Sequence, residues 1–208
     1  MSFDVDGTLV DMAFNDFIWY QAMPSLVAQK EKKSFENAYK KVIREYNRIG
    51  EHDLRWYDLN FWLDFFKISV SSKTLLMSNV DKIKVFPDVV QTLNSLKNRY
   101  KLILLTSMPR DFLDVKIESI KSYFTHQFST LSDFSRIKDA FSFQEIFNIL
   151  SINPWEFLHI GDHWKFDYLA CKEAGGHAIF LNRDGKEENH TDSGETIYNL
   201  KELLKFVK

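Results

Sequence analysis

Hydrophobic residues recur along this chain with two different periods, and the period changes near residue 83. Between residues 12 and 82 the apolar residues follow one another at steps of three and four, which is typical of amphipathic helices. From residue 86 onward, short apolar runs alternate with helical stretches, a pattern that predicts β-α-β units and a parallel sheet. The sequence therefore predicts a helical domain over residues 12–82, inserted into an α/β domain formed by residues 1–11 and 83–208.

Four helices are predicted in the helical domain, over residues 11–29, 35–49, 53–68 and 72–80. Pro24 should bend or split the first helix, because proline has no amide hydrogen to donate. Ser34 is the predicted N-cap of the second helix, and Gly50 its C-terminal stop. The third helix is apolar on nearly every side, so we expect it to be buried on more than one face and to lie at the centre of this domain.

The α/β domain is predicted to be a doubly wound, mainly parallel sheet. Strands are expected directly before Asp4 and over residues 100–105, 126–131, 157–160 and 177–181. Helices are expected over residues 87–96, 110–123, 166–175 and 197–207, with another beginning at Ser142, where Ser142 and Glu145 fit a capping box. Residues 184–196 are polar and form a predicted loop. The nearly continuous apolar strands are typical of a sheet covered on both faces.

Composition narrows the class of protein. Of the 208 residues, 45% are hydrophobic and 15% aromatic, which is typical of a packed soluble protein. The net charge of -2 argues against a general nucleic-acid surface, and no apolar run approaches the length of a membrane span. The single cysteine, Cys171, excludes an internal disulfide. We therefore expect a cytoplasmic protein that binds neither nucleic acid nor a membrane. The sequence leaves its oligomeric state open, and a monomer is compatible with it.

Two carboxylates separated by one residue end the first predicted strand. Asp4 and Asp6 begin on the same face, because side chains at i and i+2 of an extended chain point the same way, and Gly7 allows a turn directly after them. Like charges this close repel each other, and a Mg²⁺ ion would relieve the repulsion because it prefers carboxylate ligands. An acidic turn is the alternative interpretation, since aspartate and glycine are ordinary turn residues.

Polar residues also follow two further predicted strands. Thr106 and Ser107 end the second strand along the chain, and Asp162 ends the fourth. Ligands of open parallel sheets bind outside the carboxyl ends of the strands, so we expect these residues to converge with Asp4 and Asp6. A hydroxyl beside a free amide suits a phosphate oxygen, although such residues also commonly cap helices. The Asp162 carboxylate can meet the metal placed by the first two aspartates.

Together these motifs resemble, in order, the four motifs of the haloacid dehalogenase-like (HAD) superfamily. Asp-x-Asp-Gly-Thr at residues 4–8 is similar to the nucleophile motif, and Gly-Asp-x-x-x-x-Asp at residues 161–167 is similar to the fourth motif. Thr106 and Lys138 stand where the second and third motifs are expected, although the family's lysine usually precedes proline and Asp139 follows here. The inserted helical domain is similar to the family's C1 cap.

The resemblance implies a Mg²⁺-dependent phosphatase that hydrolyses a small phosphorylated metabolite through an aspartyl-phosphate on Asp4. In that reaction Asp4 is the nucleophile, Asp6 the general acid and base, and Lys138 a cation facing the phosphoryl charge. The implied site residues, grouped by role, are catalytic Asp4 and Asp6, phosphate-binding Thr106, Ser107 and Lys138, metal-binding Asp4, Asp6 (commonly through its backbone carbonyl) and Asp162, and supporting Gly7, Thr8 and Asp167.

Position 6 discriminates among reactions within the superfamily. Haloacid dehalogenases resemble this chain in fold and in the first aspartate, but they lack an acid two residues on because a halide leaving group needs no proton. Asp6 therefore points to phosphoryl transfer. A sugar-phosphate mutase of the same superfamily is one alternative. The other is a catalytically silent scaffold that binds a partner through its cap, and the intact Asp4, Asp6 and Asp162 argue against it.

Overall fold

The computed structural model describes residues 1–185 and 195–207, and the chain divides into two compact units. The core unit consists of Met1–Asp11, Val85–Ser107 and Ile117–Lys208. The helical unit consists of Met12–Lys84 and Met108–Lys116. The sequence placed residues 108–116 in the α/β domain, whereas their contacts group them with the helical unit. Residues 186–194, most of the predicted polar loop, lie outside the described residues.

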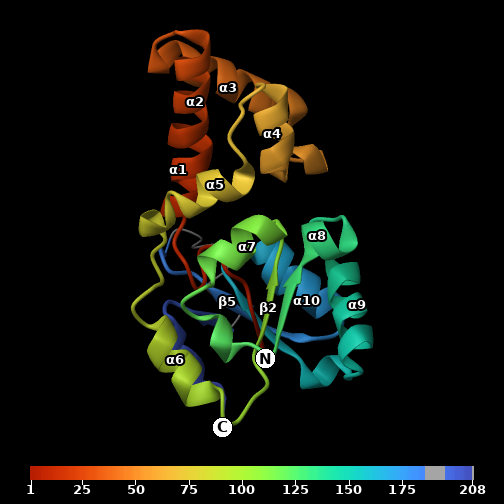
Figure 1. Ribbon diagram of the computed structural model, residues 1–208. Helices are drawn as coiled ribbons and strands as arrows, with labels where there is room; N and C mark the ends of the chain where they lie inside the picture. Colours follow the sequence, from red (N-terminus) through yellow and green to blue (C-terminus); the bar gives the residue numbers. More distant parts are fainter. Residues whose placement is uncertain (186–194, 208) are drawn as a thin grey trace. The chain divides into compact units, whose positions relative to one another are not determined.

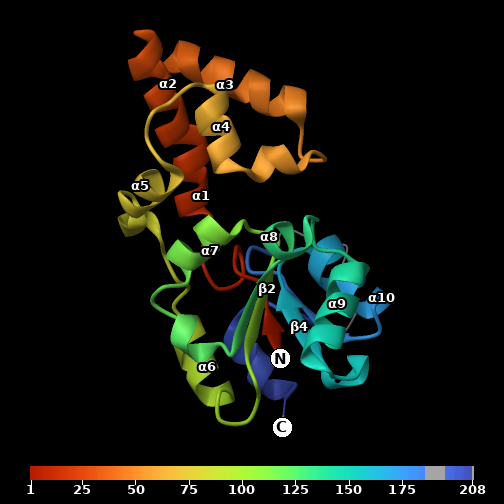
Figure 2. The same ribbon diagram turned by 45° about the vertical axis from the view of Figure 1, so that its right-hand side comes forward.

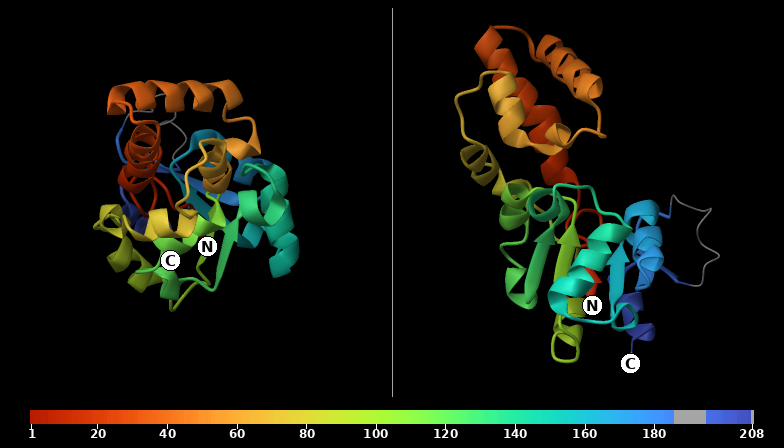
Figure 3. Two further views of the ribbon diagram at one scale, coloured as in Figure 1. Left: turned by 45° about the horizontal axis from the view of Figure 1, so that its top comes forward. Right: turned by 90° about the vertical axis from the view of Figure 1, so that its right-hand side faces the viewer.

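A six-stranded parallel sheet forms the centre of the core unit (Figure 3). Its strands are β1 (Ser2–Phe3), β2 (Ile103–Thr106), β3 (His126–Ser129), β4 (Leu158–Gly161), β5 (His177–Leu181) and β6 (Thr196–Ile197), in the spatial order β3-β2-β1-β4-β5-β6. The first strand lies between two later ones, with Phe3 opposite Leu104 on one side and Ile160 on the other. This arrangement confirms the predicted doubly wound α/β fold.

Helices cover both faces of this sheet (Figures 1 and 2). On one side α6 (Val89–Leu96) packs with the C-terminal 3-10 helix η8 (Leu200–Lys205), and on the other α9 (Ala140–Leu150) packs with α10 (Ala170–Glu173). The shorter helical segments of this unit are η4 (Lys121–Tyr123), α8 (Thr130–Phe134), η5 (Pro154–Glu156) and the π-helical η6 (Trp164–Leu169). Aromatic side chains fill the layer under α9, where the Phe157 ring lies edge-on to Phe143 and Phe147 at centroid distances of 6.1 and 5.0 Å.

Two predicted ends in the core unit are wrong for local reasons. Helix α9 begins at Ala140, because the Asp139 carboxylate accepts the Ser142 amide hydrogen at 2.9 Å and forms a capping box with that serine. The predicted box between Ser142 and Glu145 is therefore one turn too late. At the C-terminal end, Ile197, the first residue of the predicted helix, instead belongs to β6, and a 3-10 helix follows from Leu200.

The helical unit is built from short segments around buried aromatic rings. They are α1 (Ala13–Phe17), the π-helical turn η1 (Ile18–Ala22), α2 (Met23–Glu31), α3 (Phe35–Ile49), the 3-10 turn η2 (Leu54–Tyr57), α4 (Leu59–Phe65), α5 (Ser72–Met77), the 3-10 turn η3 (Val80–Lys82) and α7 (Arg110–Lys116). Ser34 caps α3 and Gly50 ends it, as predicted. Trp62 is fully buried, and the centroid of its ring lies 4.6 Å from that of Tyr46.

The continuous helix predicted over residues 53–68 is divided at Asp58. This residue is extended (φ -88°, ψ 106°), and its carboxylate accepts the amide hydrogens of Asn60 and Phe61 at 2.8 and 3.2 Å. An aspartate at an N-cap begins a new helix instead of continuing the preceding one. In the described part of the chain, every helix is too short or too polar to span a bilayer.

Candidate active site

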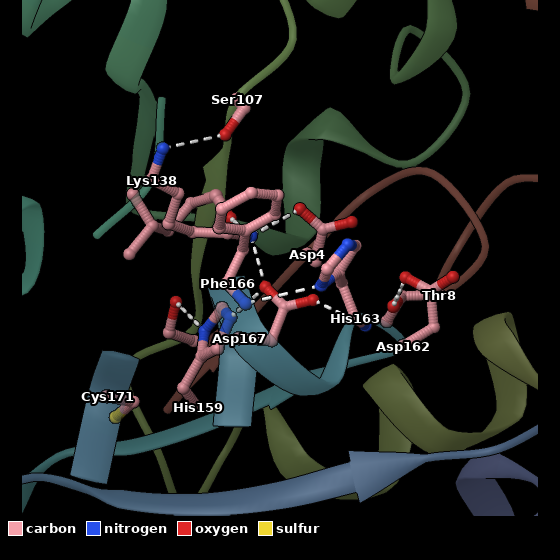
Figure 4. Close-up of polar contacts among 12 residues, drawn as sticks. Asp4, Thr8, Ser107, Lys138, His159, Asp162, His163, Phe166, Asp167 and Cys171 are labelled. Carbon is pink, nitrogen blue, oxygen red and sulfur yellow. Dashed lines mark hydrogen bonds and ion pairs between the residues drawn. The ribbon is translucent and has the colours of Figure 1, made fainter. Parts of the chain in front are cut away.

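The carboxyl ends of three adjacent strands bring the candidate site together (Figure 4). Asp4 follows β1, Ser107 follows β2 and Asp162 follows β4, and both β2 and β4 pair with β1. The Asp4 amide continues the pairing by donating to the Ile160 carbonyl at 2.9 Å. A strand register that is fixed on both sides therefore places the first aspartate.

The chain turns tightly after Asp4. The amides of Leu9 and Val10 both donate to the Val5 carbonyl, at 2.8 and 2.9 Å. Gly7 has a φ of +70°, and a Cβ atom built on it would lie 1.9 Å from Oδ2 of Asp162. Glycine is thus required at position 7 by its backbone conformation and by this close approach. The Thr8 hydroxyl donates to Oδ1 of Asp162 at 3.4 Å, so the loop is in contact with the end of β4.

Lys138 is the cation of the site. Its side chain is 3% exposed, and Nζ donates to Oδ1 of Asp4 at 2.7 Å and to the Leu105 carbonyl at 3.1 Å, and also pairs with Asp167. Its amide donates to the Ser107 hydroxyl at 2.9 Å, which anchors the loop before α9 to the end of β2. Burial alone would lower the pKa of Lys138, but the two carboxylates raise that pKa above its ordinary value. The side chain is therefore charged.

Asp167 holds Lys138 from the other side. Its Oδ2 accepts the His163 amide hydrogen at 2.9 Å, and its Oδ1 lies 2.9 Å from Nε2 of His159. Burial would raise the pKa of Asp167, but Lys138 and the bond to His159 hold that pKa well below its usual range. Burial lowers the pKa of His159 to about 4, so its ring is neutral near pH 7. Because an ionised carboxylate only accepts, His159 donates from Nε2.

Sequence reasoning missed the pair formed by Ser2 and His159. These residues lie opposite each other where β1 pairs with β4, and Nδ1 of His159 lies 3.0 Å from the Ser2 hydroxyl. Because His159 donates from Nε2, its Nδ1 accepts the hydroxyl hydrogen of Ser2. The signal that could have found the pair is a histidine between Leu158 and Ile160, in a strand that is otherwise apolar. Its partner depends on which strands are neighbours, so only the fold identifies it.

When both are ionised, Asp4 and Asp162 place more negative charge in the site than Lys138 offsets. Burial raises the pKa of Asp4 to about 7 even though Lys138 lowers it. Burial likewise raises the pKa of Asp162 to about 8, and the charges of Asp4 and Asp167 add to that rise. Such raised values mean that the site favours protonated carboxyl groups unless another cation is present.

The carboxylates fit a divalent cation. Among the described residues, one group could hold a metal ion, formed by Asp4, Asp162 and Asp167, whose ligand atoms lie within 4.8 Å of one another. Asp167 already accepts hydrogen bonds at both oxygens, so Asp4 and Asp162 are the better-placed ligands. The Asp6 carboxylate is not a member of this group, and the suggested contact through its backbone carbonyl stays a prediction.

The other predicted residues line the same edge of the sheet. Thr106 is the last residue of β2, lies opposite Ser129 and is 3% exposed. Ser107 is half-buried and accepts the Lys138 amide hydrogen. Asp6 is half-buried in the turn and forms a bridge with Val10. Their roles toward a phosphoryl group stay predictions.

Comparison with known proteins identifies the family. The model of the haloacid dehalogenase-like hydrolases matches residues 1–175. The chain belongs to this family. A HAD phosphatase from Thermococcus onnurineus is similar in structure, with a TM-score of 0.86 and 25% identity over 99% of this chain and 95% of that one. L-2-haloacid dehalogenase from Xanthobacter autotrophicus shares the fold, with a TM-score of 0.60 and 16% identity over 99% of this chain and 96% of that one.

One curated relative is similar in sequence over a shorter stretch of the chain. The GMP/IMP nucleotidase YrfG of Escherichia coli (strain K12) is 29% identical over 116 residues, which are 55% of this chain and 51% of YrfG. The match thus spans about half the length of that curated relative. The resemblance drawn from the sequence motifs is confirmed at the level of the family.

Proposed function

We propose that this HAD-like hydrolase is a Mg²⁺-dependent phosphatase that acts on a small phosphorylated metabolite through an aspartyl-phosphate on Asp4. The contact between Nζ of Lys138 and Oδ1 of Asp4, at 2.7 Å, is the observation that carries this proposal. It sets a buried cation beside a carboxylate that has Asp162 as its other neighbour. A nucleophile with a buried cation beside it suits the attack on a phosphoryl dianion, because the cation offsets the phosphoryl charge.

The proposed reaction has two steps. One oxygen of Asp4 forms a bond to phosphorus, the bond from phosphorus to the leaving oxygen breaks, and Asp6 gives that oxygen a proton. Asp6 then takes a proton from water, which attacks the phosphorus and releases Asp4 and inorganic phosphate. Lys138 offsets phosphoryl charge in both steps. When bound by Asp4, Asp162 and the Asp6 carbonyl, Mg²⁺ would offset the remaining charge.

The similarity to YrfG supports a choice of candidate substrates. YrfG is a nucleotidase for GMP and IMP, so purine nucleoside monophosphates join sugar phosphates and other small phosphomonoesters as candidates. A phosphomutase remains a second reaction of the same superfamily, and it would move phosphate within a sugar without releasing it.

Release of inorganic phosphate from a substrate panel tests the proposal. The panel contains an aryl phosphate, GMP, IMP and several sugar phosphates, each with Mg²⁺ and with EDTA. We expect Mg²⁺-dependent release from at least one compound, and none with Asp4→Asn. Failure of every compound, or isomerisation of a sugar phosphate without phosphate release, would overturn the proposal.

A further inference from the structure

Arg183 joins parts of the core unit that are far apart in the sequence. It follows β5, and its side chain is 14% exposed. The guanidinium donates to the Thr8 carbonyl from Nη2 at 2.8 Å and from Nε at 3.3 Å. It also donates to both carboxylate oxygens of Asp88 at 3.0 Å, and it lies 4.0 Å from the centroid of the Phe86 ring. Only the planar fork of an arginine can contact a carbonyl, a carboxylate and a ring face together in this way.

These partners lie where the chain leaves and re-enters the core unit. The unit boundaries fall after Asp11 and before Val85. Just inside them, Val10 and Val85 form an antiparallel bridge, and the Phe86 amide donates to the Leu9 carbonyl at 3.0 Å. Asp88 also accepts the Leu200 amide hydrogen at 2.7 Å. Arg183 thus contacts both crossing segments, and its carboxylate partner is fixed independently of it.

If Arg183 only stabilised the fold through an ion pair, its contact with Asp88 would be sufficient. The two bonds to the Thr8 carbonyl are different, because Thr8 belongs to the loop that contacts Asp162 through its hydroxyl and through the close approach of Gly7. Asp6 lies in the same loop. A shift of the Thr8 carbonyl would therefore move residues on both sides of the proposed phosphoryl site.

We propose that Arg183 is a positioning residue for the loop of residues 5–10. It holds the Thr8 carbonyl so that Gly7 and Thr8 stay against Asp162 and Asp6 keeps its place. The kinetic consequence rests on the proposed phosphatase function, whereas the ordering of the loop does not.

Arg183→Lys tests this role, because lysine keeps the charge but lacks the fork that reaches Thr8 and Asp88 together. We expect faster hydrogen–deuterium exchange at the loop amides, which bond to the Val5 carbonyl, and unchanged exchange in β4. We also expect kcat for an aryl phosphate to fall by roughly ten- to hundredfold, the scale of a small misplacement in a site. Arg99→Lys is the matched control, since the Arg99 guanidinium lies 5.4 Å from the Tyr100 ring, before β2.

Asp88→Asn separates positioning from stability. It removes the ion pair but leaves both bonds to the Thr8 carbonyl, so we expect a lower melting temperature with loop exchange and kcat near wild type. The proposal is overturned if Arg183→Lys leaves loop exchange or kcat unchanged, or if Asp88→Asn lowers kcat as far as Arg183→Lys does. If Arg183→Lys fails to fold, Arg183→Gln replaces it in both measurements, and the same outcomes overturn the proposal. Should the wild type hydrolyse no phosphomonoester, the proposed function fails while the exchange comparison still tests the ordering of the loop.

Discussion

The ammonium group of Lys138 lies 2.7 Å from Oδ1 of Asp4, although 134 positions separate the two residues in the chain. Lys138→Ala should lower kcat for an aryl phosphate by roughly a hundredfold or more, the scale of losing one charge-stabilising donor. Arg136→Ala is the control, because its guanidinium lies over Phe141 at 4.2 Å and pairs with Asp139. Its effect should be much milder, and a reversed ranking would assign the phosphate-facing role to Arg136.

Gly7→Ala should disrupt the site by steric conflict. The added Cβ would lie 1.9 Å from Oδ2 of Asp162, so either the loop or the carboxylate must move. We expect a large loss of kcat and a higher Mg²⁺ concentration for half-maximal activity. Gly50→Ala shares the positive φ (+78°) but meets no heavy atom within 4 Å, so it should cost stability only. Equal activity in the two variants would show that the contact between Gly7 and Asp162 is dispensable.

The raised pKa values of Asp4 and Asp162 predict how Mg²⁺ changes stability with pH. In the folded state Asp4 keeps its proton up to about pH 7 and Asp162 up to about pH 8. In the unfolded state both residues behave as ordinary aspartates with a pKa of 3.8 and release their protons at lower pH. The folded state therefore binds more protons than the unfolded state between these values. Without metal, the contribution of the two groups to the free energy of unfolding falls as the pH rises from 3.8 to about 8.

The proposed Mg²⁺ ion would bind the ionised carboxylates and so reverse that loss. The rise in melting temperature caused by Mg²⁺ should therefore be larger at about pH 8 than at about pH 6. Asp162→Asn should remove most of this difference and raise the Mg²⁺ concentration needed for activity. Thermal unfolding with and without Mg²⁺ at the two pH values measures the effect, and a stabilisation that does not grow with pH would contradict it.

Substrate preference should depend on residues of the helical unit. Trp56 lines a small aromatic cavity with Trp19, Tyr20 and Tyr46. We expect Trp56→Ala to change the ratio of kcat/KM between GMP and an aryl phosphate by about tenfold, the scale of one base–aromatic stack. Arg55 is the neighbouring residue and pairs with Asp53. We expect Arg55→Ala to change the same ratio of kcat/KM in a similar way.

Phe35→Ala removes an exposed ring of the same unit and serves as the control. The ratio of kcat/KM between GMP and an aryl phosphate should be the same in this variant as in the wild type. If Trp56→Ala lowers kcat/KM equally on every substrate, the ring only stabilises the helical unit.

The sequence predicted the parts of the site that depend on local order. Asp4 and Asp162 each follow an apolar strand, and parallel strands present their carboxyl ends at one edge, so their convergence could be expected. The contact between His159 and Ser2 could not, because it depends on which strands pair and in which register. The break at Asp58 was missed because apolar periodicity outweighed the capping signal of one aspartate.

The grouping of residues 108–116 with the helical unit could not be predicted from the sequence either. Their apolar pattern is that of any helix following a strand. Only the fold shows that the Phe112 ring stacks on Trp19, with centroids 5.6 Å apart. Local patterns therefore indicate element type, while the partners of an element depend on packing.

Mass spectrometry of the acid-quenched reaction tests the central claim most directly. Wild-type protein mixed with substrate and Mg²⁺ should carry one phosphoryl group on the peptide containing Asp4. Hydroxylamine should remove it, and Asp4→Asn should show neither the adduct nor turnover. An active enzyme whose Asp4→Asn variant keeps near-normal turnover, with no adduct on the wild type, would contradict nucleophilic catalysis by Asp4.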